Sequence, residues 1–288
     1  MGRKYERIVI LGTGKLFLDC LEMASHFGIP YEGYEASPNV SRMTLLQAQK
    51  KGFPCSALDR YTLFSSLAQE KKETLLISAI NPVILPEAVL KNEKILALNC
   101  HQALLPRHKG RNAESWAIYE GDMKSGITWH KMTAQVDAGE ILLQKTVPIT
   151  ETTTAYELFR QQIEAASEGF AEIIPKVLDG SAKYHAQGFY KEEGFHYSWE
   201  MPAQGRLDLE WSAEKMSRFL RATDYGILKV MERPTLVLEG EKFMIRKYKI
   251  ERITNSSQNL TQREENQLTL IRRDYRFILT LKPCSELP

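Results

Sequence analysis

Cysteine is scarce in this chain, and its few copies form no recognisable framework. Four cysteines stand at positions 20, 55, 100 and 284 of the 288 residues. Their spacing is neither paired nor typical of a metal site, which argues against a disulfide-stapled secreted fold and a zinc knuckle. We therefore expect reduced thiols and a cytoplasmic location.

Long hydrophobic runs are absent as well. The opening segment Met-Gly-Arg-Lys-Tyr-Glu-Arg leads directly into a predicted strand and lacks the apolar core of a signal peptide. No apolar stretch approaches the roughly 20 residues that a membrane-spanning helix needs. The sequence thus predicts no membrane segment.

An excess of charge of one sign is the third absence. The chain has 38 Lys and Arg against 36 Asp and Glu, a formal net charge of +2. This balance gives no global indication of binding to nucleic acid or to an anionic membrane. Internal repeats are also missing, and the length suits one large domain with an appendage, or two domains.

The first 180 residues have the pattern of an α/β fold. Apolar strands alternate with amphipathic helices, which predicts a doubly wound, Rossmann-like parallel sheet. The predicted strands are 7–14, 74–79, 95–100, 126–132 and 141–147, and the predicted helices are 16–27, 43–51, 57–71 and 154–178. Residues 133–140 are expected to form a loop between the last two strands.

The remainder of the chain reads as a smaller β domain. Residues 184–205 are irregular and aromatic, as expected of a linker, and a short helix over 211–222 is predicted with Ser212 as its cap. Strands at 235–238, 242–249, 268–271 and 277–281 would form a barrel-like β domain, and the polar segment 255–267 a mobile loop. We accordingly predict a catalytic domain over 1–183, the linker, and a C-terminal β domain over 206–288.

A glycine turn follows the first strand, formed by Gly12, Thr13, Gly14 and Lys15. It is incomplete as a dinucleotide-binding motif, because Phe17 occupies the place of the third glycine and no acidic residue clearly closes the second strand. Backbone amides at a helix N-terminus can still hold an anionic part of a substrate. Ordinary turn geometry explains these residues equally well.

The segment Ala97-Leu-Asn-Cys-His-Gln-Ala-Leu-Leu-Pro106 ends a buried strand with two polar side chains. Asn99 and His101 are two residues apart and so project to the same side, at the edge where α/β sheets bind ligands. Further motifs follow in order: Leu104-Leu-Pro106, Lys109-Gly110, Trp116-Ala-Ile118 and Asp137-Ala-Gly139. Taken singly, each has a plain structural explanation, such as a buried histidine or an ordinary loop.

Taken in order, the set resembles the active-site region of the 10-formyltetrahydrofolate-dependent formyltransferase family. That family includes glycinamide ribonucleotide transformylase, methionyl-tRNA formyltransferase, formyltetrahydrofolate hydrolase and the sugar N-formyltransferases. Its pattern is Asn-x-His-x-Ser-Leu-Leu-Pro, Arg-Gly, Trp-Ala-Ile and Asp-x-Gly. This chain departs from it at Ala103, Lys109 and Ala113, which lie beside the acceptor side of the cleft and leave the acceptor open.

The resemblance implies a formyltransferase and assigns roles to residues. Asn99 and His101 would stabilise the oxyanion formed when an amine attacks the formyl carbon. Asp137, beside His101, would raise the pKa of that histidine and receive the proton of the amine. The co-substrate 10-formyltetrahydrofolate would lie against Pro82, Val83, Ile84, Leu85, Gln135 and Val136. The acceptor would contact Gly12, Thr13, Gly14, Lys15, Lys109 and Gly110.

The acceptor is expected to be a small amine: an amino sugar nucleotide, an amino acid or a hydroxylamine, with a carrier-bound aminoacyl group also possible. Residues 206–222 resemble the start of the appended domain in methionyl-tRNA and sugar formyltransferases. A tRNA substrate is the second hypothesis, but it would require basic segments. Here residues 35–42 are nearly uncharged, and the linker carries Glu192 and Glu193.

Two hypotheses from different functional classes stay open. A folate-binding protein without turnover would keep the fold and lose the chemistry. A zinc hydrolase would recruit His108 and His130 beside His101 and Asp137, but their spacing matches no compact metal motif. No metal is therefore expected, and a homodimer is possible.

Overall fold

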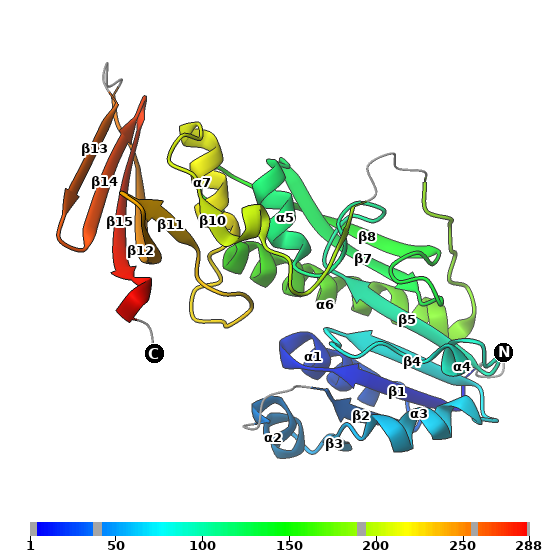
Figure 1. Cartoon of the computed structure of the whole chain (residues 1–288). Coiled ribbons are helices and arrows are strands. Elements are labelled where there is room, and N and C mark those ends of the chain that lie inside the picture. The colour runs from blue at the N-terminus through cyan, green and yellow to red at the C-terminus, as the bar shows by residue number, and fades with distance from the viewer. Residues whose placement is uncertain (1–4, 37–41, 189–193, 255–258, 287–288) are drawn as a thin grey trace. The chain divides into compact units, whose positions relative to one another are not determined.

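The computed structural model describes residues 5–36, 42–188, 194–254 and 259–286 (Figure 1). Its contacts divide the chain into two compact units that are not contiguous in sequence. The first consists of residues 1–111, 125–148 and 160–195, and the second of residues 112–124, 149–159 and 196–288. Segments 112–124 and 149–159 thus pack with the C-terminal part of the chain, whereas the domain limits expected from the sequence remain a prediction.

The first unit contains a seven-stranded sheet with the strand order β3-β2-β1-β4-β5-β7-β8. Its strands are β1 (Arg7–Gly12), β2 (Tyr31–Glu35), β3 (Cys55–Ala57), β4 (Thr74–Ala79), β5 (Ile95–His101), β7 (Lys124–Lys131) and β8 (Ile141–Pro148), with β6 (Lys109–Gly110) outside it. The five strands from β3 to β5 are parallel, and β7 runs antiparallel to β5. This confirms the Rossmann-like core, which β7 and β8 extend on one side, with β7 antiparallel to β5.

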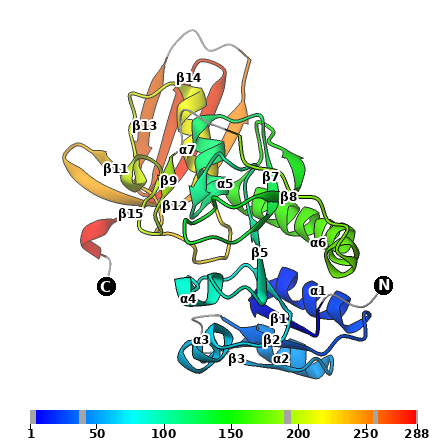
Figure 2. The same cartoon turned by 90° about the vertical axis from the view of Figure 1, so that its right-hand side faces the viewer.

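Helices cover both faces of this sheet (Figure 2). They are α1 (Gly14–Ser25), α2 (Met43–Lys50), α3 (Arg60–Ala68), α4 (Glu87–Leu90) and α6 (Ala155–Asp179). Val9 and Leu11 of β1 face a cluster with Leu63 and Phe64 of α3 and Val89 of α4. Each fully buried side chain of this size contributes roughly 1.5–3 kcal/mol, so Val9 and Leu11 help to hold α3 and α4 on this face of the sheet.

Phe17, which stands in the place of the third glycine of a dinucleotide-binding motif, is accommodated by Gly33 of β2. Phe17 of α1 is fully buried. A Cβ added to Gly33 of β2 would lie 3.0 Å from the Phe17 ring and 2.8 Å from Leu21. Gly33 therefore provides the close approach of helix and strand that the missing glycine would otherwise give.

The second unit is built on a six-stranded curled sheet with the order β10-β11-β12-β15-β14-β13. Its strands are β10 (Arg206–Leu207), β11 (Thr235–Leu238), β12 (Glu241–Arg252), β13 (Leu260–Glu264), β14 (Gln267–Arg272) and β15 (Tyr275–Pro283). The remaining elements are α5 (Ala113–Glu120), α7 (Ala213–Ala222), β9 (Phe195–His196) and the 3₁₀ turns Pro202–Gly205 and Cys284–Glu286. Met216 and Phe219 of α7 pack on Phe243 and Phe277 of the sheet.

The helix and strand predictions for both units are confirmed except at two places. The helix expected over 57–71 begins only at Arg60, where Asp59 caps α3 by accepting from the N–H groups of residues 61 and 62. The segment 255–267 is not simply a loop, since Leu260–Glu264 forms β13 and pairs with β14. All five residues of β13 are exposed, so this edge strand has no apolar alternation to reveal it.

None of the helices in the described ranges is both long and apolar enough to cross a lipid bilayer. Residues 37–41 of the expected uncharged loop, and Glu192 and Glu193 of the expected linker, lie outside the described residues.

Candidate active site

Asn99 and His101 stand at the carboxyl end of β5, as their spacing predicts. The antiparallel register of β5 and β7 places Asn99 opposite His130. The Asn99 side chain donates from Nδ2 to His130 Nε2 across 3.2 Å. His101 and His130 are both buried, with 6% and 2% exposure. A second histidine therefore joins the pair predicted from the sequence.

Asp137 lies in the loop between β7 and β8, whose backbone is tightly held. Asp137 adopts a left-handed φ of 52°, a conformation that Asp tolerates better than most residues. At Gly139, an added Cβ would lie 1.9 Å from the carbonyl oxygen of Lys131, so only glycine fits. Gln187 donates from Nε2 to the carbonyl oxygens of Asp137 and Gly139, each at 2.9 Å.

The Asp137 carboxylate sits between the two imidazoles. Its Oδ2 atom lies 3.4 Å from His101 Nδ1 and accepts from the Gly110 N–H at 2.9 Å. Its Oδ1 atom lies 3.4 Å from His130 Nε2. The expected proximity of Asp137 and His101 is confirmed, and the carboxylate proves to be shared by a second histidine.

In each imidazole, the ring nitrogen that does not face Asp137 is hydrogen-bonded to a backbone carbonyl oxygen. His101 Nε2 lies 2.8 Å from the His108 carbonyl oxygen, and His130 Nδ1 lies 2.8 Å from the Lys131 carbonyl oxygen. Because a carbonyl oxygen only accepts, each of these nitrogens carries a hydrogen. In the neutral rings, the nitrogens that face Asp137 are therefore unprotonated and able to take up a proton.

The electrostatics correct one expectation. Burial lowers the pKa of His101 below its ordinary value of 6.5, and this outweighs the opposing effect of Asp137. The charge of Asp137 does raise this pKa, as the motif predicts, but the desolvation of a fully buried ring, which the motif does not reveal, is the larger influence. Burial alone would raise the pKa of Asp137, yet His101, His130 and the Gly110 N–H together lower it to about 2. We conclude that the resting site pairs an ionised carboxylate with a neutral His101.

The segment expected to contact the folate begins directly after β4. Ile80 has a left-handed φ of 55°, which is strained for a β-branched residue. The Asn81 side chain then donates to the Val83 carbonyl at 2.9 Å and accepts from the Val83 N–H at 3.0 Å. Of the expected residues here, Pro82 and Val83 are half-buried and Leu85 belongs to the core, whereas Ile84 is 77% exposed. Both backbone groups of Val83 are thus engaged within the loop.

The second expected folate segment lies in the loop that carries Asp137. Gln135 and Val136 are exposed, and the Gln135 carbonyl accepts from the Thr133 hydroxyl at 2.8 Å. Val136, like Ile84, presents an apolar side chain to solvent.

The expected acceptor residues fall into two groups. Lys109 and Gly110 form β6, and Lys109 is buried. Gly12, Thr13 and Gly14 link β1 to α1, but the exposed Lys15 pairs with Asp19 at 2.6 Å. The structure also shows that an acidic residue does close the second strand, since Glu35 is the last residue of β2.

Two residues beside Asp137, His130 and Gln187, are not among the site residues expected from the sequence. The sequence suggests His130 only as a zinc ligand, and nothing near Gln187 in the sequence points to a role. His130 reaches the site through the antiparallel register of β5 and β7, and no local sequence pattern encodes that register. Trp116, Ala117 and Ile118 lie on α5 in the second unit, where Trp116 stacks on His196 with ring centroids 4.2 Å apart.

Comparison with known proteins now decides the family. Residues 31–174 match the family model described as formyl transferase. The chain belongs to the formyl transferase family. The GDP-perosamine N-formyltransferases of Brucella melitensis biotype 1 and Brucella abortus are each 34% identical over 148 residues, which is 51% of this chain and 56% of the relative. The chain thus matches little more than half the length of these curated formyltransferases.

Solved structures with the same fold extend over nearly the whole chain. The sugar 3-N-formyltransferase WlaRD, crystallised in the presence of dTDP and 5-N-formyltetrahydrofolate, has a TM-score of 0.73 at 17% identity, covering 99% of this chain and 100% of its own. An N-formyltransferase from Helicobacter canadensis, in complex with folinic acid and dTDP-3-aminofucose, has a TM-score of 0.75 at 17% identity and covers 96% and 99%. These likenesses establish the formyltransferase fold.

Proposed function

We propose that this formyl transferase family member moves the formyl group of 10-formyltetrahydrofolate to the amine of a nucleotide-linked amino sugar. The observation that carries the proposal is the Asp137 carboxylate held between His101 and His130, with Asn99 beside them. Acyl transfer to an amine requires a group that takes the proton of the nucleophile and a donor for the oxyanion. This constellation supplies both.

The ionised Asp137 accepts the proton that the attacking amine loses. Its two oxygens lie 3.4 Å from the unprotonated nitrogens of His101 and His130, so the proton can pass to His101 and make it an imidazolium. That imidazolium remains stabilised by Asp137 and by the His108 carbonyl, and it returns the proton to the departing folate nitrogen. The second amide hydrogen of Asn99, the one not used toward His130, stabilises the oxyanion on the formyl carbon.

The two loops expected to contact the folate, at residues 82–85 and 135–136, each present an apolar side chain against which a flat ring can pack. Ile84 and Val136 are exposed apolar side chains on these loops, at 77% and 38%. A pterin ring placed against them removes apolar surface from water, which favours binding.

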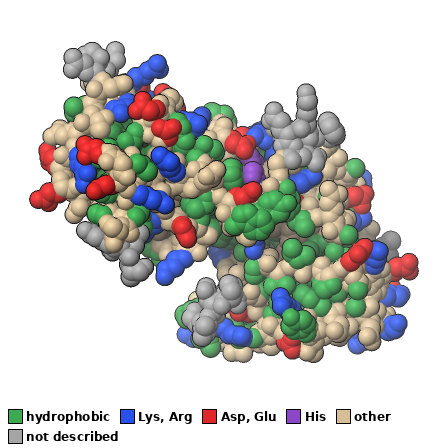
Figure 3. Space-filling view, in the orientation of Figure 1, with side chains coloured by type: hydrophobic (Ala, Val, Ile, Leu, Met, Phe, Trp, Pro, Cys, Tyr) green, Lys and Arg blue, Asp and Glu red, His purple; other side chains and the backbone are tan. Residues whose placement is uncertain are grey.

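A sugar acceptor is supported by the relatives and by the charge pattern. The curated relatives act on GDP-perosamine according to their names, and they share 34% identity with this chain. On the face drawn in Figure 3, basic and acidic side chains are interspersed over the C-terminal sheet. A tRNA-binding surface would gather basic side chains along a phosphate path, so we favour the small acceptor.

Release of tetrahydrofolate tests the proposal directly. The full chain is incubated with 10-formyltetrahydrofolate and, in separate arms, with nucleotide-linked amino sugars, amino acids or aminoacylated tRNA. We expect release that depends on an amino sugar, that is lost in Asp137→Asn and that persists in the surface control Asp179→Asn. Release that occurs only with tRNA, equal release without any acceptor, or folate binding without release would each overturn the proposal.

A further inference from the structure

Glu35 ends β2 at the same sheet edge as the proposed catalytic residues. The strand register pairs Gly12 of β1 with Glu35 on one side and with Ala79 of β4 on the other. A Cβ added to Gly12 would lie 1.9 Å from the Ala79 carbonyl oxygen, so the turn after β1 is pressed against β4. Glu35 is therefore fixed beside the turn that leads into α1.

One oxygen of the Glu35 carboxylate ends a directed chain of hydrogen bonds. Oε1 accepts from the Thr13 hydroxyl at 3.1 Å, and because a carboxylate only accepts, the direction of that bond is fixed. Thr13 Oγ1 lies 3.3 Å from the Thr44 hydroxyl, and Thr44 Oγ1 accepts from the Gly14 N–H at 3.1 Å. Every hydrogen in this chain thus points toward Glu35.

The other oxygen of Glu35 is left open. Glu35 is 98% buried, at 2% exposure, and among the described residues its Oε2 atom has no hydrogen-bond partner and no ion-pair partner. Buried polar atoms without partners are rare and call for an explanation. Burial, with a smaller contribution from the Glu35 charge, raises the pKa of the Cys55 thiol to about 11, so this thiol stays neutral at physiological pH.

An acceptor-only atom at this place suits a ligand hydroxyl. In doubly wound folds, an acidic residue that closes the second strand binds the ribose hydroxyls, while the diphosphate lies at the turn after the first strand and the helix that follows. Here that helix, α1, has 12 residues, and the Thr13 hydroxyl at its N-terminus bonds Glu35 and makes no capping hydrogen bond to the first N–H groups of the helix. By its place at the end of β2, the Glu35 carboxylate thus corresponds to the acidic residue that receives a ribose hydroxyl in such folds.

The sheet also sets the length of the ligand. Glu35, Gly12, Ala79 and Asn99 lie on the successive strands β2, β1, β4 and β5. Three strand spacings correspond to roughly 14 Å from Glu35 to Asn99. A diphosphate and a hexose can bridge that gap, whereas an amino acid or hydroxylamine cannot.

We infer that Glu35 binds the ribose 2′-hydroxyl of the acceptor's nucleotide, so that this protein selects a ribonucleotide-linked over a 2′-deoxyribonucleotide-linked amino sugar. The inference rests on the proposed function and narrows its acceptor class. It makes Glu35 a specificity-determining residue that takes no part in the proton transfers.

Equilibrium binding of nucleotides tests this without any turnover. Calorimetric titrations compare GDP with 2′-deoxy-GDP and UDP with 2′-deoxy-UDP on the full chain. For at least one base we expect the ribonucleotide to bind about tenfold or more tightly, the usual strength of a hydrogen bond to a charged group. Glu35→Gln should reduce that ratio toward one. Glu32→Gln, on the same strand but at its opposite end, should leave the ratio unchanged.

Equal affinity for the ribo- and deoxyribonucleotides in the wild type, no binding of any nucleotide, or a ratio that survives Glu35→Gln would overturn the inference. The wild-type ratio needs no variant, so misfolding of Glu35→Gln cannot mask the result. Formyl transfer to deoxyribonucleotide sugars alone would leave the proposed function standing and refute this inference. A preference for ribonucleotides in binding, without formyl transfer to any sugar, would support this inference and refute the proposed function.

Discussion

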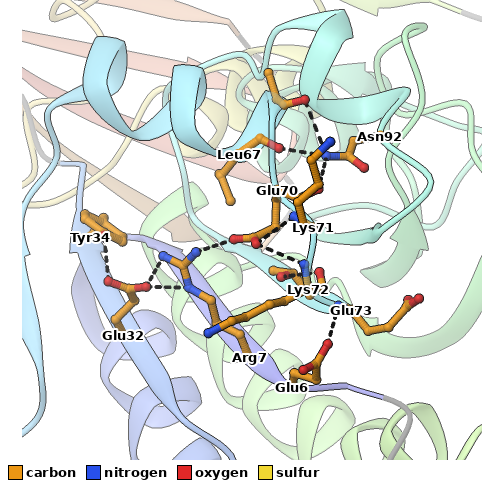
Figure 4. Close-up of polar contacts among 12 residues, drawn as sticks. Glu6, Arg7, Glu32, Tyr34, Leu67, Glu70, Lys71, Lys72, Glu73 and Asn92 are labelled. Atoms are coloured by element: carbon orange, nitrogen blue, oxygen red, sulfur yellow. Dashed lines mark hydrogen bonds and ion pairs between the residues drawn. The ribbon is translucent and has the colours of Figure 1, made fainter.

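The parallel strands of the seven-stranded sheet begin at one edge, here called the amino edge, and end at the other, the carboxyl edge. The charged groups at these two edges differ in how they are paired. At the amino edge, Arg7 at the start of β1 donates to Glu32 of β2 and to Glu70 after α3 (Figure 4). Glu32 also accepts from the Tyr34 hydroxyl at 2.6 Å, and Glu70 accepts from the two following backbone N–H groups at 2.9 and 3.0 Å. Every carboxylate oxygen of this network has a donor.

The carboxyl edge has acceptors in excess. Asp137 faces two imidazole nitrogens that are unprotonated in the neutral rings, and Glu35 keeps one oxygen without a donor within the described part of the chain. The backbone is also strained there at Ile80, a β-branched residue with a left-handed φ angle. These carboxylates leave acceptor capacity for ligands that bring donors, such as amines that give up protons and sugars that present hydroxyls. The amino edge holds paired charges that stabilise the fold, whereas the carboxyl edge carries the residues of the proposed chemistry.

The largest effect should come from removing the acceptor at the centre of the carboxyl edge. Asp137→Asn keeps the shape and the tolerance for a left-handed φ but cannot take the amine proton. We expect kcat/KM for formyl transfer to fall about 10³-fold, within the range for a lost general base. Thermal unfolding checks that the variant is folded. A folded Asp137→Asn protein with wild-type turnover would remove Asp137 from the mechanism.

A smaller effect is expected at His130, which we regard as a positioning residue. Its Nε2 atom holds Asn99 at 3.2 Å and lies 3.4 Å from Asp137. His130→Phe should lower kcat about 10- to 100-fold with little change in KM, and His130→Gln should restore part of the loss because its amide oxygen can accept from Asn99. The charge of His130 also lowers the pKa of His101, so the acid limb of the pH profile should move upward in His130→Phe. An unmoved limb would indicate a purely structural role.

The amino edge should respond in stability and not in turnover. Arg7→Met leaves Glu32 and Glu70 without their cation, and both are partly buried, at 34% and 11% side-chain exposure. We expect a loss of about 1–2 kcal/mol in the free energy of unfolding, because these groups are partly screened by solvent. The matched control Lys94→Gln breaks a more exposed pair with Glu73 and should leave the free energy of unfolding nearly unchanged. Urea titrations measure both, and a tenfold fall in kcat for Arg7→Met would contradict this division.

The sequence predicted best the features that local spacing encodes. The two-residue period of β5 placed Asn99 and His101 together, and the alternation of strands and helices indicated the Rossmann-like core. His130 and Gln187 escaped because they arrive through the β5–β7 register and through a contact 50 residues away from Asp137.

Several features were missed because their segments carry weak patterns. Strand β2 has the sequence Tyr-Glu-Gly-Tyr-Glu, which lacks an apolar run, so the acid at its end was not recognised as closing a strand. Strand β13 is exposed along its whole length. The pKa of His101 was misjudged because the charge of Asp137 can be read from a motif, whereas burial cannot. The roles assigned to the site residues stay predictions.

The smallest expected effect is a shift in the acid limb of the pH profile of kcat/KM. The position of that limb shows whether burial or the charge of Asp137 dominates the pKa of His101. Its pKa lies below 6.5 because burial disfavours the imidazolium. A neutral imidazole must receive the proton, so turnover is complete above this pKa and is lost as the pH falls through it. The limb of kcat/KM should therefore lie below pH 6.5.

A formyl donor without N5, 10-formyl-5,8-dideazafolate, avoids cyclisation in acid and permits that measurement. NMR titration of the His101 ring gives the same pKa without turnover. Because the charge of Asp137 raises this pKa, Asp137→Asn should lower it further. A limb above pH 6.5 in the wild type would mean that the charge of Asp137 outweighs burial, and that the resting site at the carboxyl edge already holds the proton we assign to the amine.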